Sequence, residues 1–404
     1  MMKLKRITYF LLLFIIMIVG LAWFNYSRTD FVNMRANRYG YLKNKNIRDV
    51  NIGVVWPFKD LPTYTQGIEL ALSEIEKEKG FSYRFILHFK DEKLGETDIW
   101  DFANNKKIVA AIGFLNSGSV KACAPILGEA GVLVLECGTN PFLLERNFQL
   151  TAGNSYSDFY HADNIKGIVK SLGMKKIAII YKDTEYCNGM FTLFSFQIGK
   201  EKDFYCTSIN EYNEKSYVEP IYDRIVDTEF DGIVFFGYSE DASFLLKYLR
   251  KIGYRKPFIG NEILDTDDFT KSFGSSFDLS NVYCSSYDTA FDRTPELKAF
   301  AERYKQKFNS APDQWSLCGY SAIMLLKKAI DNQGSLLPPS LYRSIIYSNY
   351  TILGLKYEYG TNGLLKLNLT SSKKWMPGKG FIPFLTGKDS GDYEDSTWQF
   401  EKRF

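Results

Sequence analysis

The sequence is poor in the residues from which catalytic and metal centres are usually built. Only two histidines, His88 and His161, occur in 404 residues, and the six cysteines include no C-x-x-C pair. A His/Cys metal site therefore has little to be built from, and any disulfide pairing is not readable from the spacing. The G-x-S-x-G, P-loop and H-E-x-x-H patterns are also absent. We predict a protein that is not an enzyme and that holds no metal or cofactor.

A basic surface for nucleic acid is missing as well. The formal net charge is +3 at pH 7, and Lys3, Lys5 and Arg6 account for it, because residues 1–22 contain no acid and the remaining chain is formally neutral. No helix-turn-helix pattern precedes residue 50. We therefore expect no nucleic-acid partner, and a DNA-binding regulator is disfavoured.

One long hydrophobic run is present. Residues 7–24 are apolar and follow three cations, and a run of 18 residues is near the lower limit for a helix that spans a bilayer. Gly20-Leu21-Ala22 is also a triplet that a signal peptidase could accept. An uncleaved signal anchor, a cleaved signal peptide and a misread core helix all remain open. The first two place the body outside the cytoplasm, in the periplasm or on the outer face of the membrane, with residues 25–49 as a stalk.

Residues 108–141 read as strand, polar turn, helix, strand and second polar turn. Residues 108–114 form a short apolar run, which is typical of a strand buried on both faces. Consecutive parallel strands deliver their C-terminal turns to one edge of the sheet, where ligands bind in open α/β sheets. Ser117 and Thr139 are therefore expected side by side in a cleft. Hydroxyls and backbone N–H groups beside a helix N-terminus suit a carboxylate or a phosphate.

A second α/β series begins after a loop at about residues 140–155. Strands are expected at 176–181, 230–236 and 257–260, each followed by a polar turn. The architecture of the first series recurs, although no sequence repeat is visible. We predict an α/β protein of two Rossmann-like lobes.

Five segments carry a resemblance to a known family, in matching order between about residues 51 and 363. They read IGFLNSGSVKACAPILGEAGVLVLECGTNP, LTAGNS, KIAIIYKDTEYCNG, FDGIVFFGYSED and KPFIGNEIL. The chain resembles the branched-chain amino-acid-binding (Leu/Ile/Val-binding) family of type I periplasmic binding proteins, the receptors of ABC importers. The resemblance implies two lobes joined by three crossings, a small amino acid or related carboxylate as ligand, and an importer permease as partner.

In the lobe boundaries expected from this resemblance, each lobe consists of two separate segments of the chain. They assign 50–153 and 290–350 to the first lobe, 154–289 and 351–385 to the second lobe, and 386–404 to a tail.

The resemblance also implies roles for individual residues. Ser117 and Thr139 match positions that take the ligand carboxylate, and Thr139 also contacts the ammonium group. The backbone carbonyl of Cys137 and the carboxylate of Glu262 match acceptors from the ammonium group. Tyr186 matches an aromatic wall of the cleft.

Two further aromatic residues are candidates for the cleft wall. Tyr238 follows a strand of the second lobe, and Trp56 ends the first strand. The loop after Val55 is shorter than is usual in the family, so the aromatic residue that covers the ligand there has no clear counterpart; Trp56 or Tyr64 is the candidate.

The proposed residue types are physically coherent. A zwitterion removed from water needs both of its charges paired. Ser117 and Thr139 on one lobe and Glu262 on the other would supply the partners, and only a closed cleft offers both sets. The competing interpretation makes Ser117 and Thr139 simple helix caps and Glu262 a solvated loop acid.

Two rival functions belong to other classes. The same fold could present its ligand state to a signalling partner in the membrane, which a retained N-terminal helix would favour. An enzyme on a doubly wound fold would be recognised by turnover of its bound ligand.

Overall fold

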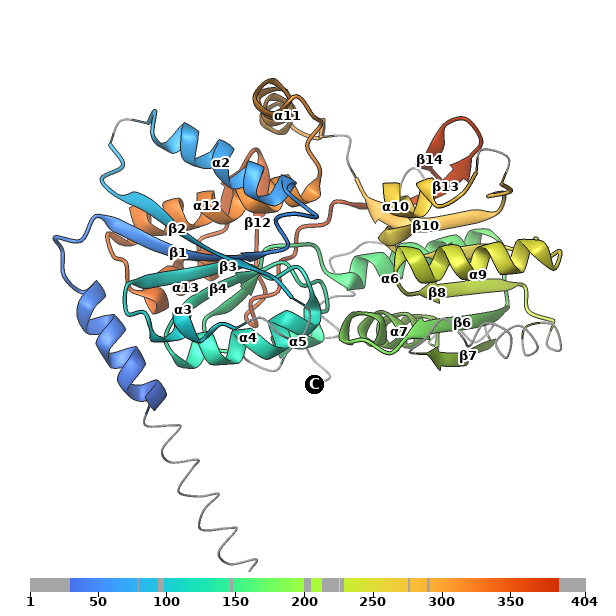
Figure 1. Cartoon of the computed structure of the whole chain (residues 1–404), viewed down its shortest axis with the longest axis horizontal. Helices are drawn as coiled ribbons and strands as arrows, with labels where there is room; N and C mark the ends of the chain where they lie inside the picture. Colours follow the sequence, from blue (N-terminus) through green and yellow to red (C-terminus); the bar gives the residue numbers. More distant parts are fainter. Residues whose placement is uncertain are drawn as a thin grey trace, which may run out of the picture.

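The computed structural model shows two α/β lobes side by side (Figure 1). It describes residues 30–78, 80–93, 98–145, 148–199, 205–212, 225, 229–274, 277–288 and 291–384. The predicted anchor or signal peptide at 1–24 and the tail at 386–404 lie outside these ranges. None of the helices within the described ranges has the length and apolar character needed to cross a bilayer.

The first lobe is built on a parallel sheet with the strand order β2-β1-β3-β4-β5. β3 and β4 are buried along their whole length, as expected of apolar strands covered by helices on both faces. The strands are β1 (Asp49–Trp56), β2 (Arg84–Asp91), β3 (Ile108–Gly113), β4 (Leu133–Glu136) and β5 (Thr151–Gly153). The helices of this lobe are α2 (Thr63–Ile75), α3 (Trp100–Asn104), α4 (Ser117–Glu129), α5 (Phe142–Glu145), α11 (Pro295–Phe308), α12 (Gln314–Gln333) and α13 (Pro338–Tyr347).

The second lobe repeats this topology. Its parallel strands lie in the order β7-β6-β8-β9-β10, and two antiparallel strands, β13 and β14, extend the sheet beyond β10. The strands are β6 (Lys176–Lys182), β7 (Tyr205–Tyr212), β8 (Gly232–Phe236), β9 (Phe258–Gly260), β10 (Val282–Tyr287), β13 (Thr370–Met376) and β14 (Gly380–Pro383). Its helices are α6 (Asp158–Ser171), α7 (Glu185–Ile198), α9 (Ser239–Lys251), the 3-10 helix η2 (Glu262–Asp265) and α10 (Asp267–Lys271). The predicted fold class of two Rossmann-like lobes is confirmed.

The chain passes between the lobes three times. The crossings follow β5, follow β10 and precede β13. The second and third crossings run together, because the N–H of Asp288 donates to the carbonyl of Leu369 at 2.7 Å. The Arg293 side chain joins them again, with Nε donating to Asp288 at 2.9 Å and Nη1 to the carbonyl of Asn368 at 3.1 Å. These paired segments form the hinge.

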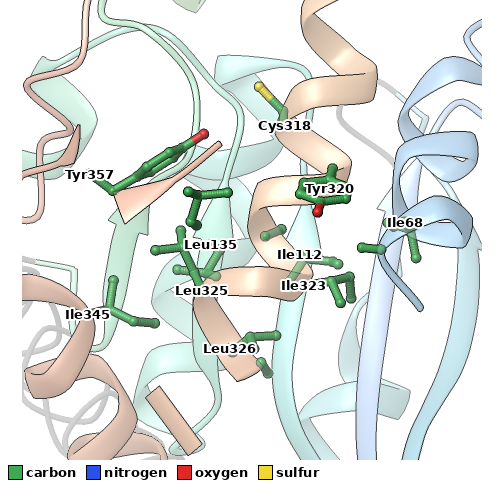
Figure 2. Close-up of a cluster of buried hydrophobic side chains, with 14 of the residues drawn as sticks. Ile68, Ile112, Leu135, Cys318, Tyr320, Ile323, Leu325, Leu326, Ile345 and Tyr357 are labelled. Atoms are coloured by element: carbon green, nitrogen blue, oxygen red, sulfur yellow. The ribbon is translucent and has the colours of Figure 1, made fainter. Parts of the chain in front are cut away.

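The third crossing lies later in the chain than the expected boundary at residue 351. A hairpin of β11 (Tyr350–Ile352) and β12 (Leu355–Tyr357) still belongs to the first lobe. Figure 2 shows Tyr357 in one apolar cluster with Leu325 of α12 and Ile345 of α13. Leu369 is buried in the same core. These apolar side chains complete the first lobe, and the chain leaves it only at Thr370.

The expected stalk is, in its described part, a helix packed on the first lobe. Residues 30–42 are helical (the dark blue helix at the lower left of Figure 1). Arg38 lies on this helix and is fully buried. Its guanidinium donates to the carbonyls of Ile108 at 3.0 Å, Phe102 at 3.0 Å, Ala103 at 2.8 Å, Asn105 at 3.0 Å, and also of Ala130. The polar composition of this segment suggested a spacer, but its one buried cation anchors it to the body.

Helices α2 and α12 pack at very close range through glycine. A Cβ atom added at Gly319 of α12 would clash with the backbone carbonyl of Tyr64 in α2, which cannot move without shifting the helix. We therefore expect Gly319→Ala to lower the free energy of unfolding by about 2 kcal/mol. The midpoint of urea unfolding, followed by circular dichroism, measures this change.

Gly40 provides the matched control. It lies in the helix at 30–42, and a Cβ atom there would meet nothing within 4 Å. Gly40→Ala should be neutral or stabilising, by up to about 1 kcal/mol, because alanine has the higher helix propensity. If both variants unfold at the wild-type urea concentration, the close helix contact does not exist in solution.

Candidate functional site

A cavity of about 970 Å³ lies between the two lobes. Residues from both lobes line it, and most of them follow the C-terminal ends of parallel strands, the edge at which open α/β sheets bind ligands. Five of the residues expected to form the site are in the wall: Ser117, Thr139, Tyr186, Tyr238 and Glu262. The cavity therefore brings these five side chains together, although Ser117 and Glu262 are 145 positions apart in the sequence.

The first-lobe wall contains the N-terminus of α4. Ser117 is the first residue of this helix, and Asn116 before it is extended. The buried carboxylate of Glu92 accepts from the backbone N–H groups of Leu115 at 2.7 Å and Asn116 at 2.9 Å. The loop is thereby fixed, and the following N–H groups, of Ser117 and Gly118, belong to the first helical turn, where no intrahelical acceptor is available. They are suited to a ligand carboxylate.

Thr139 lies in the next strand-end loop, after β4. Its carbonyl accepts from the N–H of Asp158 at 2.8 Å, so the loop is tied to the start of α6. Burial raises the pKa of the Asp158 carboxyl well above its usual value, and the nearby charge of Glu262 adds to the shift. The protonated, neutral form of Asp158 is therefore favoured. Thr139 itself is nearly buried and lines the cavity.

Glu262 is held in place by a short chain of hydrogen bonds in the second lobe. The hydroxyl of Tyr186, in the first turn of α7, donates toward Glu262 Oε1 and Oε2, at 2.7 and 2.8 Å. Nδ2 of Asn261 donates to the same hydroxyl at 2.7 Å. Burial raises the pKa of Glu262 to about 6, although the bond from Tyr186 lowers it. The carboxylate keeps free lone pairs, so it can accept from a ligand ammonium group.

Two expected contacts, Cys137 and Trp56, do not line the cavity. Both are fully buried. The N–H of Cys137 donates to Gly113 at 2.7 Å, which holds this residue within the sheet. The indole of Trp56 donates to the carbonyl of Leu61 at 2.7 Å and stacks on Tyr64 at 4.2 Å between ring centroids, so it is part of the core.

Trp315, which was not predicted, lines the cavity. It follows Asp313 and Gln314 at the N-terminus of α12 and packs against Trp56 and Tyr287. Tyr287 also lines the cavity, at the end of β10. The strand-end rule applied to residues 282–286 could have found Tyr287. No local signal marked Trp315, because a tryptophan in an apolar helix reads as core.

The lobes already touch beside the cavity. Lys121 of α4 pairs with Glu185 of α7 at 2.5 Å, and Nδ2 of Asn140 donates to the carbonyl of Glu185 at 3.1 Å. These contacts join the two lobes at Glu185, the first residue of α7 and the neighbour of Tyr186 in the sequence. The first-lobe and second-lobe walls therefore face one another across a short distance.

The described residues offer little for metal or redox chemistry. Within the described ranges, no group of three or more His, Cys, Asp or Glu side chains is placed to hold a metal ion. The five cysteines whose side chains the structure describes are free and buried.

Two lobes of the same topology, three crossings and a cavity between them define a protein that binds a small solute by hinge closure. The profile of the family described as "Periplasmic binding protein" matches residues 62–346. The chain belongs to this family, and its two parallel-sheet lobes are those of the type I fold. The family consists of binding proteins, which are not enzymes, and it places the body outside the cytoplasm. The family resemblance read from the sequence is confirmed.

Individual relatives are distant. One relative is the "Leucine-, isoleucine-, valine-, threonine-, and alanine-binding protein" of Pseudomonas aeruginosa, which is 22% identical over 265 residues. The match covers 60% of this chain and 64% of that protein, just under two thirds of the relative's length. The "Leu/Ile/Val-binding protein homolog 7" of Brucella abortus is 20% identical over 82% of this chain and 90% of its own length. A substrate-binding protein of an ABC transporter from Desulfitobacterium hafniense, solved in complex with Leu, has a TM-score of 0.70 at 22% identity and covers 83% of this chain and all of its own. At this identity the structural likeness shows the fold.

Proposed function

We propose that this protein captures a small α-amino acid, or a closely related carboxylate, between its lobes and delivers it to the permease of an ABC importer. The observation that carries the proposal is the shared cavity of Ser117, Thr139 and Glu262. An N-terminal helical turn with two hydroxyls faces a carboxylate that Tyr186 orients. These groups are complementary to the two charges of a zwitterion.

Hinge closure follows because the partners of the two ligand charges lie on different lobes. In an open cleft the ligand reaches either the first-lobe hydroxyls or Glu262, and one of its charges remains without a protein partner. Closure satisfies both charges, so the ligand shifts the equilibrium by its differential affinity for the closed form. The paired crossings at Asp288 and Leu369 give the rotation an axis.

The names of the relatives support an amino-acid ligand. Those names specify leucine, isoleucine and valine, and for one relative also threonine and alanine. The strand-end loops that would hold the ligand main chain are present in this chain, whereas Trp56, one candidate for the aromatic cover, lies in the core and Trp315 lines the cavity. The α-carboxylate and α-ammonium groups are therefore the best supported part of the ligand.

Calorimetric titration of the full-length chain, in mild detergent because of its apolar N-terminal run, with each of the twenty amino acids tests the proposal. Binding with a dissociation constant of about 1 μM, near −8 kcal/mol, would be ample for capture. An analogue of a binding amino acid that lacks the α-ammonium group should give no heat of binding. Binding of simple carboxylates in preference to every amino acid would contradict the role given to Glu262.

The affinity for an amino acid is expected to fall as the pH decreases through about 6. Burial raises the pKa of Glu262 to about 6 in the free protein. Only the ionised carboxylate pairs with an ammonium group, so below this pH binding must first displace a proton, and the affinity should drop about tenfold per pH unit. Titrations between about pH 5 and pH 8 measure the profile. Tyr186→Phe, which removes the hydrogen bonds that lower this pKa, should move the midpoint to higher pH; a flat profile in both proteins would contradict the assignment.

Sensing for a membrane partner is the second candidate, and the docked helix at 30–42 favours it. Arg38 fixes this helix to the first lobe. The helix therefore sets the orientation of the first lobe relative to the residues that precede the helix in the chain. A permease that co-purifies with the protein and amino-acid uptake that depends on it would support import. Ligand-dependent activity of a co-purified kinase or cyclase would support sensing.

A further inference from the structure

We propose that the ligand of the interlobe cavity is a cationic amino acid, whose side chain carries a positive charge in addition to the α-ammonium group. This inference rests on the proposed function, because it names the class of amino acid that the same site takes. Three observations support it: the charge of the cavity wall, the placement of two acids without a salt bridge, and a buried amide oxygen without a hydrogen-bond partner.

The cavity wall is acidic. Among the described residues that form it there is no lysine, arginine or histidine, whereas seven are carboxylic acids: Asp60, Glu185, Glu262, Asp265, Asp267, Asp268 and Asp313. Lysines from outside the wall pair with three of them, as Glu185–Lys121, Asp265–Lys373 and Asp267–Lys271. A zwitterion with a neutral side chain requires only Glu262. The wall therefore holds more negative charge than such a ligand would match.

Asp60 and Asp268 are the two acids best placed for a second cation. Asp60 lies in the loop after β1 of the first lobe, and Asp268 lies in α10 of the second. Both are exposed and line the cavity, and the described part of the chain gives neither a salt bridge; the charge of Lys271 acts on Asp268, but its ammonium group is bonded to Asp267 at 2.6 Å. Asp313 differs, because it caps α12 by accepting from the N–H of Ser316 at 2.8 Å and from Thr63 at 2.7 Å.

These two acids make closure depend on ligand charge. Closing the cleft brings carboxylates of opposite walls nearer to each other and removes water, which strengthens their repulsion. A side-chain cation between Asp60 and Asp268 replaces this repulsion with attraction, whereas an aliphatic side chain leaves it in place. A cationic ligand therefore has the larger differential affinity for the closed form.

Gln314 gives independent support for a polar ligand in this part of the cavity. It is the first residue of α12, only 5% exposed, and it lines the cavity. Its Nε2 interacts with the hydroxyl of Tyr287, whereas within the described ranges Oε1 has no hydrogen-bond partner. A buried amide oxygen without a partner is costly, and Oε1 would accept from a guanidinium or ammonium N–H. Trp315 and Tyr287 offer aromatic faces beside it, which also attract cations.

The size of the cavity agrees with a long side chain. Its volume of about 970 Å³ lies near the upper end of the range for small-molecule sites, about 300–1,000 Å³. Ser117, Thr139 and Glu262 share this wall with the acids and Gln314. A cavity of this volume has room for a lysine or arginine side chain in addition to the α-groups.

Matched pairs of ligands test the proposal on the full-length chain. Arginine is compared with citrulline, and lysine with norleucine, because each pair differs mainly in the side-chain charge; leucine is the neutral reference. We expect calorimetry to give arginine an affinity at least about tenfold above that of citrulline, and lysine a similar advantage over norleucine. The Asp60→Asn, Asp268→Asn double variant should reduce both ratios toward one.

A second double variant controls for net charge. Glu76→Gln and Glu302→Gln remove the same two charges from exposed positions outside the cavity, and they should leave the arginine to citrulline ratio unchanged. If leucine or citrulline binds as tightly as arginine, the cationic class is wrong while amino-acid capture stands. If the two double variants change the ratio equally, the effect is one of net charge, and the roles of Asp60 and Asp268 are overturned. If none of the amino acids binds, capture itself fails.

Discussion

Glu262→Gln is expected to reduce the affinity for the amino-acid ligand at least about 100-fold. The substitution keeps the size and shape of the side chain but removes its charge, so the ligand ammonium group is left without an anionic partner in the closed cleft. Breaking such a buried pair by removing one member typically costs about 3–5 kcal/mol. Calorimetry with the wild-type ligand, at a pH of about 7.5 where the wild-type carboxylate is ionised, measures the loss.

The folding of the Glu262→Gln variant should remain intact. Burial disfavours the ionised carboxylate, as its raised pKa shows, so a neutral amide at this position does not weaken the free protein. The unfolding midpoint without ligand should therefore be unchanged or slightly higher. Glu302→Gln, an exposed acid outside the cavity, serves as the control and should bind normally. An affinity within about threefold of wild type would show that the ammonium group is bound elsewhere.

Arg38→Met is expected to lower the free energy of unfolding by about 3–5 kcal/mol. Methionine fills much of the space of the arginine stem, but it leaves five backbone carbonyls without their donor. A buried acceptor without a partner costs about 1–3 kcal/mol, and the five groups lie too deep for water to replace the guanidinium fully. Burial lowers the pKa of Arg38 to about 10, which still leaves it charged at neutral pH, so the hydrogen bonds are charge-assisted.

Arg35→Met is the matched control for this experiment. Arg35 lies on the same helix, one turn earlier, and its side chain is about one third exposed where it meets Gln149 and Glu129. Its loss should cost less than about 1 kcal/mol. Hydrogen exchange adds a local readout, because amides at 30–42 should lose protection in Arg38→Met and keep it in Arg35→Met. Equal stability of the two variants would mean that the helix is not anchored by Arg38.

Much of the site followed from rules that act within short stretches of sequence. Apolar runs at 108–113 and 232–236 mark buried strands, and the residues after such strands meet at one sheet edge. This rule, together with the family resemblance, led to Ser117, Thr139 and Glu262, which all line the cavity. Tyr186 and Tyr238 also line it, from the start of α7 and the position before α9.

The failures share a physical cause. Trp56 ends an apolar strand and is core, whereas Trp315 near the start of α12 lines the cavity, because α12 packs its N-terminus against the end of β1. The helix at 30–42 was predicted to be part of a stalk because its composition is polar. Nothing in its local sequence distinguishes Arg38, which donates hydrogen bonds to five backbone carbonyls of distant segments. The hairpin after residue 350 was assigned to the wrong lobe, since short strands give no sign of which core they complete.

The sequence by itself determined the two-lobed α/β architecture, the family, and the strand-end loops that would receive a carboxylate and an ammonium group. These depend on periodicity and turn residues, which are local properties of the chain. Only the tertiary structure decided which side chains share the cavity, that its wall is acidic, and that Arg38 fixes the N-terminal helix. Each of these depends on contacts between segments far apart in the chain, and the free energy of such contacts is set by packing and desolvation that no single stretch of sequence records.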